Sequence, residues 1–491
     1  MSQLFFDVFA SLIRSSISFP EHNQNILLDI ADEEKIVGQA TSIFQQIFGP
    51  NKYSYDNLPI NPQKSKDIIK ECFEKKDYFF NKYLLSYLDS LIDIDKLKRD
   101  ITSRYIIEYG NNPPIEGLNS NIKETKIIIL PKFRTPFQAT HKQKQVIESE
   151  SSAEHSKKEN KRWNDEINNM LLNLFFVDVE KLNGFNIVNI FFEQDFSDKS
   201  FFTVGFTPIT NVPFQRLFSY DSIVRKHKNG HRIKYLSNIT LLNKEQIEER
   251  FLACYELACK NKIDLLFAPE LLGTDSLTNV DKYGRNPLLK GKKEYSYFTP
   301  LVTLTPTYWN NCTNSLSIYT KNGKRVSIQY KQNSYVHAGK TEDLSNTKKE
   351  IVVAHINGWG RLVFPICADL LNENYRNILV TELNATMVIC PSFSPGTREF
   401  EKISSLCSAH DFYCIWGNSC AATSSNPEPP EYPAIVSLPI ISSAPERTRL
   451  HTKCDQNCEK PCLFRIKIPL QLKGDSLHED KNAEYDHIFS E

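Results

Sequence analysis

The chain has 491 residues, of which 40% are hydrophobic and 11% aromatic, so most of it can bury enough apolar surface to fold, and its length predicts two or three domains. Lys plus Arg and Asp plus Glu both number 59, and this balance leaves no long-range field to attract nucleic acid or anionic lipid. Nucleic acid is therefore not an expected partner.

Neither an export signal nor a membrane span is expected. The first 18 residues contain a single Arg and an apolar stretch without a small-residue cleavage pattern. No run of 18 apolar residues occurs anywhere in the chain. We therefore expect a cytoplasmic protein with no membrane partner, whose 12 cysteines are thiols or metal ligands and not a disulfide framework.

Residues 1–182 are predicted to form a mostly helical N-terminal domain. Apolar residues recur every three or four positions over residues 64–109, and a second helical pattern covers residues 163–182. A short strand is expected at 126–130. Residues 141–162 mix Lys, Glu, Ser and Gln with almost no apolar residues, which predicts a charged, solvated linker.

Residues 183–475 are predicted to form a layered α/β domain, and residues 476–491 a tail. Asn243 has the character of a helix-capping residue, and one face of the helix that follows carries Ile247, Phe251, Cys254, Tyr255 and Ala258. Residues 263–268 are apolar almost throughout, which indicates a strand buried on both faces. The basic segment 208–243 is expected to be an irregular insertion with a solvated surface.

Further elements alternate along the rest of this domain. β-branched and aromatic runs predict strands at 315–320, 325–330, 351–356, 361–366, 386–390 and 412–417. Helical patterns fill the gaps at 371–383 and 399–409. Strands alternating with helices are typical of an α/β sheet.

Three reactive side chains stand just beyond predicted strand ends. Glu270 follows LLFAP, Lys331 follows SIQY, and Cys367 follows RLVFPI. An α/β fold collects catalytic groups at such ends, because the strands hold them rigidly while leaving them accessible. Singly each signal is weak, since a Glu or Lys at a strand end is usually a surface residue and a Cys among apolar neighbours is usually inert core.

The order of these residues resembles the nitrilase, or carbon-nitrogen hydrolase, superfamily, whose members carry a Glu-Lys-Cys triad. LACKNKIDLLFAPELLG, NSLSIYTKNGKRVSIQYK and GRLVFPICADLL resemble the family's Pro-Glu element, lysine hairpin and nucleophile segment. The resemblance continues through ATMVICPSFSP and REFEKISSLCSAHDFYCIWGN and covers about residues 201–420. It implies a nitrilase-type α-β-β-α sandwich and a homo-oligomer.

The resemblance implies a hydrolase of carbon-nitrogen bonds, with a small-molecule amide a more usual substrate than a nitrile. Cys367 would be the nucleophile and Glu270 the general base, while Lys331 and the N–H of Ala368 would stabilise the tetrahedral intermediate. A thioester on the cysteine would then be hydrolysed, with no cofactor for catalysis. Glu342 is the nearest match to a second glutamate that positions substrate in many relatives.

A cysteine-rich segment at 451–462 could bind a metal. Three thiols and an imidazole, from His451, Cys454, Cys458 and Cys462, can complete a tetrahedral zinc shell. The spacing differs from the common Cys-x2-Cys knuckle, so free or redox-active thiols and an iron-sulfur site remain alternatives. Any zinc here would be structural and separate from catalysis.

Two other functional classes compete with the hydrolase. The large N-terminal region and the insertion before Asn243 suit a non-catalytic scaffold or effector protein that uses the sandwich for interaction. Nitrilase-like modules also occur beside reverse transcriptases in bacterial phage-defence proteins, although this chain has no Tyr-x-Asp-Asp motif. Nucleic-acid binding through residues 225–232 and the cysteine cluster is the weaker alternative.

Overall fold

The chain folds as two compact units, one made of Met1–Phe133 with Gln138–Gly184 and the other of Arg134–Phe137 with Phe185–Glu491. The predicted linker at 141–162 lies outside the part that is described. The computed structural model describes residues 3–17, 38–39, 42, 78–90, 92–93, 95–98, 126–133, 167–168, 171–196, 198–226, 232–290, 298–337, 339–410, 412–423, 432–439, 449–454, 460–470 and 483–490.

The described part of the first unit mixes helix and sheet. It contains α1 (Gln3–Ile17), α4 (Tyr78–Ser90) and an antiparallel pair of strands, β1 (Ile127–Pro131) and β2 (Leu174–Asp178). The strand predicted from the sequence is therefore present, but a mostly helical unit is not supported. The helix expected over 163–182 is wrong in its second half, because every residue of β2 is buried in the strand pair with β1 and that burial outweighs the helical spacing; residues 167–168 are helical.

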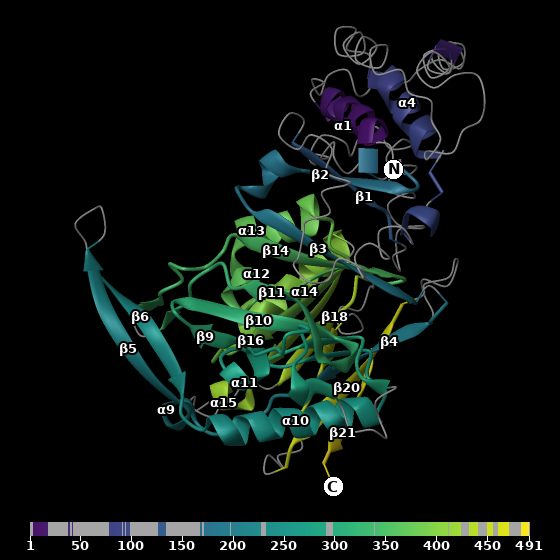
Figure 1. The fold of residues 1–491 in the computed structure, drawn as a ribbon. Helices are drawn as coiled ribbons and strands as arrows, with labels where there is room; N and C mark the ends of the chain where they lie inside the picture. Colours follow the sequence, from purple (N-terminus) through teal and green to yellow (C-terminus); the bar gives the residue numbers. More distant parts are fainter. Residues whose placement is uncertain are drawn as a thin grey trace. The chain divides into compact units, whose positions relative to one another are not determined.

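Two mixed sheets form the body of the second unit (Figure 1). The first sheet contains β4 (Phe201–Phe206), β7 (Leu265–Phe267), β8 (Val302–Leu304), β9 (Tyr308–Asn310), β10 (Thr313–Thr320), β11 (Lys324–Tyr330), β20 (Cys462–Pro469) and β21 (Glu484–Phe489). The second sheet contains β3 (Asn186–Asp195), β14 (Glu350–Asn357), β15 (Gly360–Val363), β16 (Met387–Ser392), β17 (Tyr413–Asn418), β18 (Ala434–Ser437) and β19 (Arg449–His451). Their strand orders are β11-β10-β8-β7-β4-β20-β21, with β9 beside β10, and β19-β18-β17-β16-β15-β14-β3.

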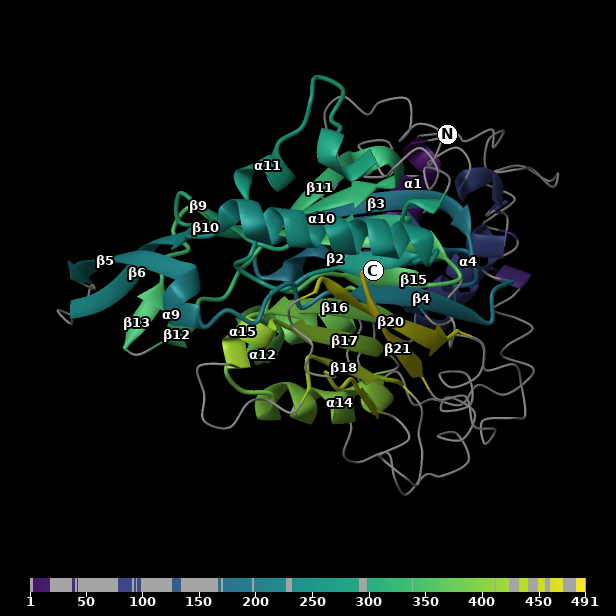
Figure 2. The ribbon, with the colours of Figure 1, turned by 90° about the horizontal axis from the view of Figure 1, so that it is seen from below.

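Helices cover the outer faces of the two sheets (Figure 2). The face of α10 (Lys244–Lys260) that the sequence predicted to be apolar is buried, although Asn243 makes no side-chain capping bond at its start. On the opposite side, α14 (Arg398–His410) packs Phe400 against Trp416 of β17, with ring centroids 4.8 Å apart. No helix in the described ranges is both long and apolar enough to cross a membrane.

A glycine lies where side chains of the two sheets pack against each other. A Cβ on Gly417 of β17 would lie 2.4 Å from the ring of Phe206 on β4 and 2.6 Å from that of Phe267 on β7. Any larger residue there would push the facing rings, because protein interiors are packed as densely as organic crystals. The absence of a side chain at this position therefore lets the aromatic core between the sheets close.

The prediction of an irregular insertion at 208–243 is wrong, because this segment contains a β-hairpin. Strands β5 (Phe218–Lys226) and β6 (Arg232–Leu241) pair with each other, and β13 (Lys340–Glu342) and β12 (Val336–His337) extend the sheet in the order β12-β13-β6-β5. Exposed and more buried residues alternate along much of β6, as expected of a strand with one solvated face. The basic residues of this strand are typical of such a solvated face. We call these four strands the arm sheet.

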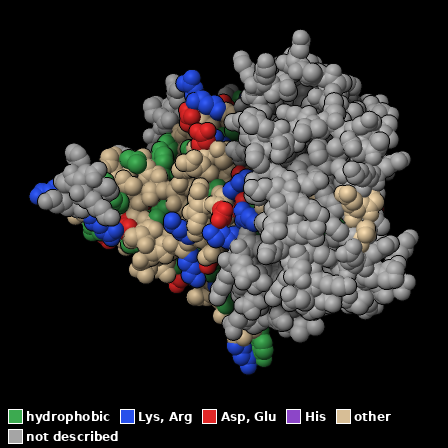
Figure 3. All heavy atoms as spheres, turned by 90° about the horizontal axis from the view of Figure 1, so that it is seen from above, with side chains coloured by type: hydrophobic (Ala, Val, Ile, Leu, Met, Phe, Trp, Pro, Cys, Tyr) green, Lys and Arg blue, Asp and Glu red, His purple; other side chains and the backbone are tan. Residues whose placement is uncertain are grey.

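The arm sheet lies at one side of the second unit and carries both apolar and charged side chains. Its strands β5 and β6 appear in teal at the left of Figure 1, and Figure 3 shows hydrophobic side chains on this part of the surface with basic ones near its end. The exposed apolar residues on its two outer strands are Tyr220, Ile223, Val224 and Val336. Among the described residues, this sheet joins the insertion to the loop that follows β11.

Two predictions near the end of the domain also change. The segment expected as a tail after residue 475 supplies β21, which pairs antiparallel with β20. The helix expected over 371–383 is divided into α12 (Ala368–Leu371), α13 (Glu373–Asn377) and a π-helical turn, η6 (Ile378–Glu382). A segment such as β21 can form a strand without a strong pattern of apolar residues, because pairing with β20 satisfies the hydrogen bonds of its backbone.

Replacing Gly417 by Ala is expected to lower the free energy of unfolding by about 1–3 kcal/mol, because the new methyl group overpacks the space occupied by two phenyl rings. Chemical denaturation of the two proteins measures this difference. Gly396→Ala is the matched control, because no atom lies within 4 Å of a Cβ at that position. Equal losses in both variants would show that the sheets do not meet at Gly417.

Candidate active site

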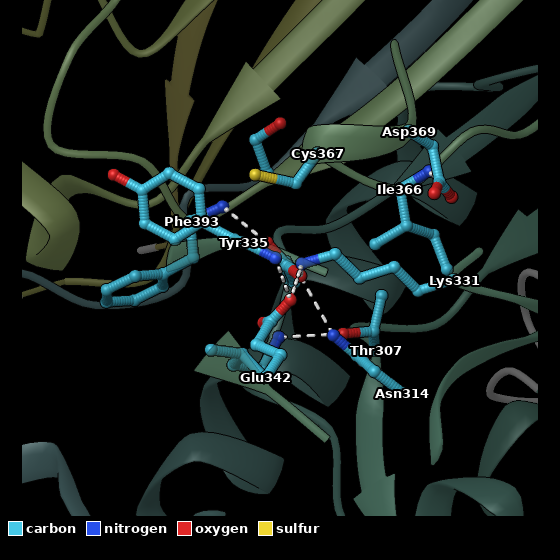
Figure 4. Close-up of polar contacts among 12 residues, drawn as sticks. Thr307, Asn314, Lys331, Tyr335, Glu342, Ile366, Cys367, Asp369 and Phe393 are labelled. Carbon is cyan, nitrogen blue, oxygen red and sulfur yellow. Dashed lines mark hydrogen bonds and ion pairs between the residues drawn. The ribbon is translucent and has the colours of Figure 1, made fainter. Parts of the chain in front are cut away.

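The structure brings together the three reactive side chains that the sequence singled out. Glu270 follows β7, and Lys331 follows β11 directly, so both come from the first sheet. Cys367 lies between β15 of the second sheet and α12. All three are buried, with exposed fractions of 2%, 0% and 3%. Strand ends from both sheets therefore meet at one site, as Figure 4 shows for the lysine and the cysteine.

The ammonium group of Lys331 lies between two carboxylates. Its Nζ is 2.6 Å from Oε1 of Glu270 and 2.6 Å from Oε2 of Glu342. Glu342 is the last residue of β13 and is itself buried. The glutamate that the sequence suggested as an auxiliary residue thus contacts the lysine directly.

Both carboxylates are oriented by further hydrogen bonds. The amide Nδ2 of Asn314 donates to Oε1 of Glu270 at 2.8 Å, and the backbone N–H of Phe393 donates to its Oε2 at 3.2 Å. The backbone N–H of Tyr335 donates to Oε2 of Glu342 at 2.8 Å. Each acid is therefore held in one position by neutral donors as well as by the lysine, and Figure 4 shows these contacts.

Cys367 lies on a strained turn. Its φ angle is 48° and its ψ angle −106°, a conformation that residues with a side chain rarely adopt. The turn is held by the N–H of Cys367, which donates to the carbonyl of Pro391 at 2.9 Å, and by the N–H of Ile366, which donates to Oδ2 of Asp369 at 3.0 Å. Backbone strain that is held in this way is typical of functional sites.

Asp369 also connects the cysteine turn to the lysine loop. Its Oδ1 accepts hydrogen bonds from the backbone N–H groups of Gln332 and Asn333, at 2.8 and 2.7 Å, and from the side-chain amide of Asn333 at 3.0 Å. Burial raises the pKa of this carboxyl to about 6, although the N–H donors oppose that shift. One carboxylate thereby fixes the two loops that carry Cys367 and Lys331.

The charges at the site favour a protonated lysine beside a neutral thiol. Burial opposes the charge on Lys331, but attraction to Glu270 and Glu342 outweighs it and holds the pKa of the ammonium well above its usual range. Burial, reinforced by the negative charge of Glu270, raises the pKa of the Cys367 thiol well above its usual range. Burial also raises the pKa of Glu342, in spite of its ion pair with the lysine.

Three further residues belong to the site but were not predicted as part of it. Asn314 and Phe393 contact Glu270, and Tyr335 lies four residues after the lysine. Burial and the neighbouring Cys367 raise the pKa of the Tyr335 phenol. Asn314 begins the lysine hairpin quoted from the sequence and could have been found from its place there, whereas the other two are brought in only by the folding of loops.

The predicted metal ligands lie on different elements. His451 ends β19 in the second sheet and packs against Tyr432 in a tilted arrangement with ring centroids 4.2 Å apart, whereas Cys462 begins β20 in the first sheet. Cys454 is described, and Cys458 lies outside the described residues. Within the described ranges, no group of three His, Cys, Asp or Glu side chains could hold a metal ion. A zinc site stays a prediction from the sequence.

Comparisons with known proteins found similarity at the level of solved structures. No family model and no curated protein matches the chain significantly. An amidase from Nesterenkonia sp. AN1, with an acetamide moiety covalently added at its active-site cysteine, is 10% identical with a TM-score of 0.36, covering 56% of this chain and 94% of that chain.

Two further solved structures have similar scores. A second structure of the Nesterenkonia enzyme, described as an amidase from the nitrilase superfamily, is 11% identical with a TM-score of 0.33, over 56% of this chain and 93% of that chain. Glutamine-dependent NAD+ synthetase from Acinetobacter baumannii is 15% identical with a TM-score of 0.29, over 45% and 38%. The solved structures similar to this chain thus include nitrilase-superfamily amidases, over about half of the chain and at low identity.

Proposed function

We propose that the second unit hydrolyses carbon-nitrogen bonds, with Cys367 as nucleophile, Glu270 as general base and Lys331 as the cation that stabilises negative charge. The observation that carries this proposal is the single buried ammonium group held between two carboxylates beside a thiol on a strained turn. Perturbed titratable groups that converge in this way are typical of catalytic sites.

The first step is attack of the sulfur on the carbonyl carbon of an amide. The thiol is neutral at rest, because its pKa is raised well above its usual range, so a base must remove its proton as the C–S bond forms. The carboxylate of Glu270 accepts that proton. Negative charge develops on the carbonyl oxygen and is stabilised by the ammonium of Lys331 and the N–H of Ala368, the first residue of α12.

The second half of the reaction releases the amine and then the acid. The protonated Glu270 donates its proton to the leaving nitrogen, the C–N bond breaks, and a thioester remains on Cys367. A water molecule then attacks the thioester carbonyl while Glu270 takes its proton, and that proton returns to the sulfur as the C–S bond breaks. Glu342 contributes by holding the lysine in place and keeping it charged.

An amide is the preferred substrate class over a nitrile because of the resemblance in sequence, since amidases make up most of that family's range. The proposed reaction needs a small-molecule substrate, water and the side chains already described. It needs no cofactor or metal. The alternative of a non-catalytic scaffold has no specific support at this site, because a scaffold has no need for a buried ammonium next to a thiol.

Replacing Cys367 by Ala is expected to lower the rate of ammonia release from simple amides by about 10³-fold or more, because no other group can form the thioester. The melting temperature should change little. Cys259→Ala, which removes a buried thiol from α10, is the matched control and should retain its rate. A rate that survives in the Cys367 variant would exclude the proposed mechanism.

Replacing Glu270 by Gln removes both its negative charge and its ability to accept a proton. Two measurements distinguish these effects. Burial raises the pKa of the Cys367 thiol and the negative charge of Glu270 raises it further, so the loss of that charge should lower the pKa. The rate of Cys367 alkylation by iodoacetamide, followed from pH 6 upward, should therefore begin to rise at a lower pH in the variant than in the unchanged protein. Ammonia release should nevertheless fall about 10²-fold or more, because the proton acceptor is gone.

Glu399→Gln is the control for this pH experiment, because Glu399 is exposed and pairs with Lys402 on α14. It should leave both the alkylation profile and the rate unchanged. An unshifted alkylation profile in Glu270→Gln would mean that the glutamate does not act on the thiol. A shifted profile with a normal rate of ammonia release would mean that another group is the base.

A further inference from the structure

Two aromatic side chains border the space in front of the Cys367 sulfur. In Figure 4 the rings of Tyr335 and Phe393 lie on the side of the site toward which the sulfur points. Burial and the neighbouring Cys367 both raise the pKa of the Tyr335 phenol. Phe393 is attached to the site by its own N–H, which donates to Glu270. Both side chains are only partly buried, so ring surface is left for contact with a ligand.

A second tier of aromatic rings supports this border. The ring of Phe393 lies 5.9 Å from that of Phe214 in α9 (Phe214–Leu217) and 5.4 Å from that of Phe218 at the start of β5. The rings of Phe214 and Phe218 are 5.1 Å apart, and Phe218 is buried. Aromatic clusters of this geometry are rigid and strongly apolar. We call Phe214, Phe218, Tyr335 and Phe393 the aromatic wall.

The charge at the site gives no attraction for an anionic substrate. The ion pairs of Glu270 and Glu342 in the described part of the chain both end on Lys331, so one positive charge is shared by two acids. Among the described residues, no further lysine or arginine is paired with these two acids, so the balance of charge around Lys331 does not favour a carboxylate on the substrate. A charged acyl group would lose its hydration without gaining a partner, which is costly. The apolar surface of the aromatic wall and the paired charges at Lys331 therefore both favour an uncharged, apolar substrate.

Resting on the proposed function, we propose that the substrate is an uncharged amide whose acyl group is aromatic or branched and apolar, and that this group packs on Phe393 and Tyr335. Phe214 of α9 and Phe218 of β5 position the Phe393 ring. The arm sheet therefore contains the strand that ends at Glu342 and also contributes to substrate selection. Tyr335 and Phe393 would touch the substrate, whereas the other two rings act through Phe393.

The test compares benzamide, acetamide and succinamate with the full chain. Benzamide should have a value of kcat/KM about tenfold or more above that of acetamide, and succinamate should be the poorest of the three. Phe393→Ala should lower the benzamide-to-acetamide ratio by about tenfold, and Phe214→Ala by a smaller factor. Phe298→Ala removes an exposed ring elsewhere in the unit and should leave the ratio unchanged.

A binding measurement keeps this inference separate from the proposed reaction. Each amide is tested for protection of Cys367 against iodoacetamide, which needs no turnover, and benzamide should protect at the lowest concentration. Protection by benzamide without hydrolysis would overturn the hydrolase and support the wall as a binding surface. Hydrolysis with a preference for acetamide or succinamate, or an unchanged ratio in both Phe393→Ala and Phe214→Ala, would overturn the wall and leave the hydrolase intact.

Discussion

The buried ammonium of Lys331 is the interaction on which the rest of the site depends. A fully buried cation is unfavourable unless its loss of hydration is offset by paired charges and hydrogen bonds in good geometry. Glu270 and Glu342 supply both at 2.6 Å, and each is oriented by neutral donors. The two ion pairs of Lys331 therefore require the ends of β7, β11 and β13 to lie together. They would break if any of the three strand ends moved away.

The nucleophile turn is tied to this arrangement by a second buried acid. Asp369 accepts hydrogen bonds from Ile366, beside Cys367, and from Gln332, beside Lys331. The two loops come from different sheets, so their separation depends on how closely the sheets pack. That packing is set in part by Gly417, where a side chain would collide with the rings of the facing sheet. Gly417 is paired with Pro391, whose carbonyl accepts the hydrogen bond from the N–H of Cys367, so this core position contributes to the geometry of the site.

The inserted hairpin is an integral part of the second unit. β6 pairs in parallel with β13, the strand that ends at Glu342, and the start of the insertion supplies the rings of Phe214 and Phe218 that support Phe393. The inserted segment thus fixes the position of Glu342, which holds Lys331, and supports the aromatic wall beside Cys367. This connection offers a physical route by which variation in the insertion could change substrate preference without altering Glu270, Lys331 or Cys367.

The sequence alone singled out the three reactive side chains that the fold brings together. Glu270, Lys331 and Cys367 follow strands whose apolar runs are visible locally, and the amphipathic face of α10 follows from its spacing, because both signals arise within a few residues. Contacts between distant segments could not be found in this way. The arm sheet, β2 and β21, the contact of Glu342 with the lysine and the aromatic wall were decided only by tertiary structure, since burial and strand pairing across long separations outweigh local propensity.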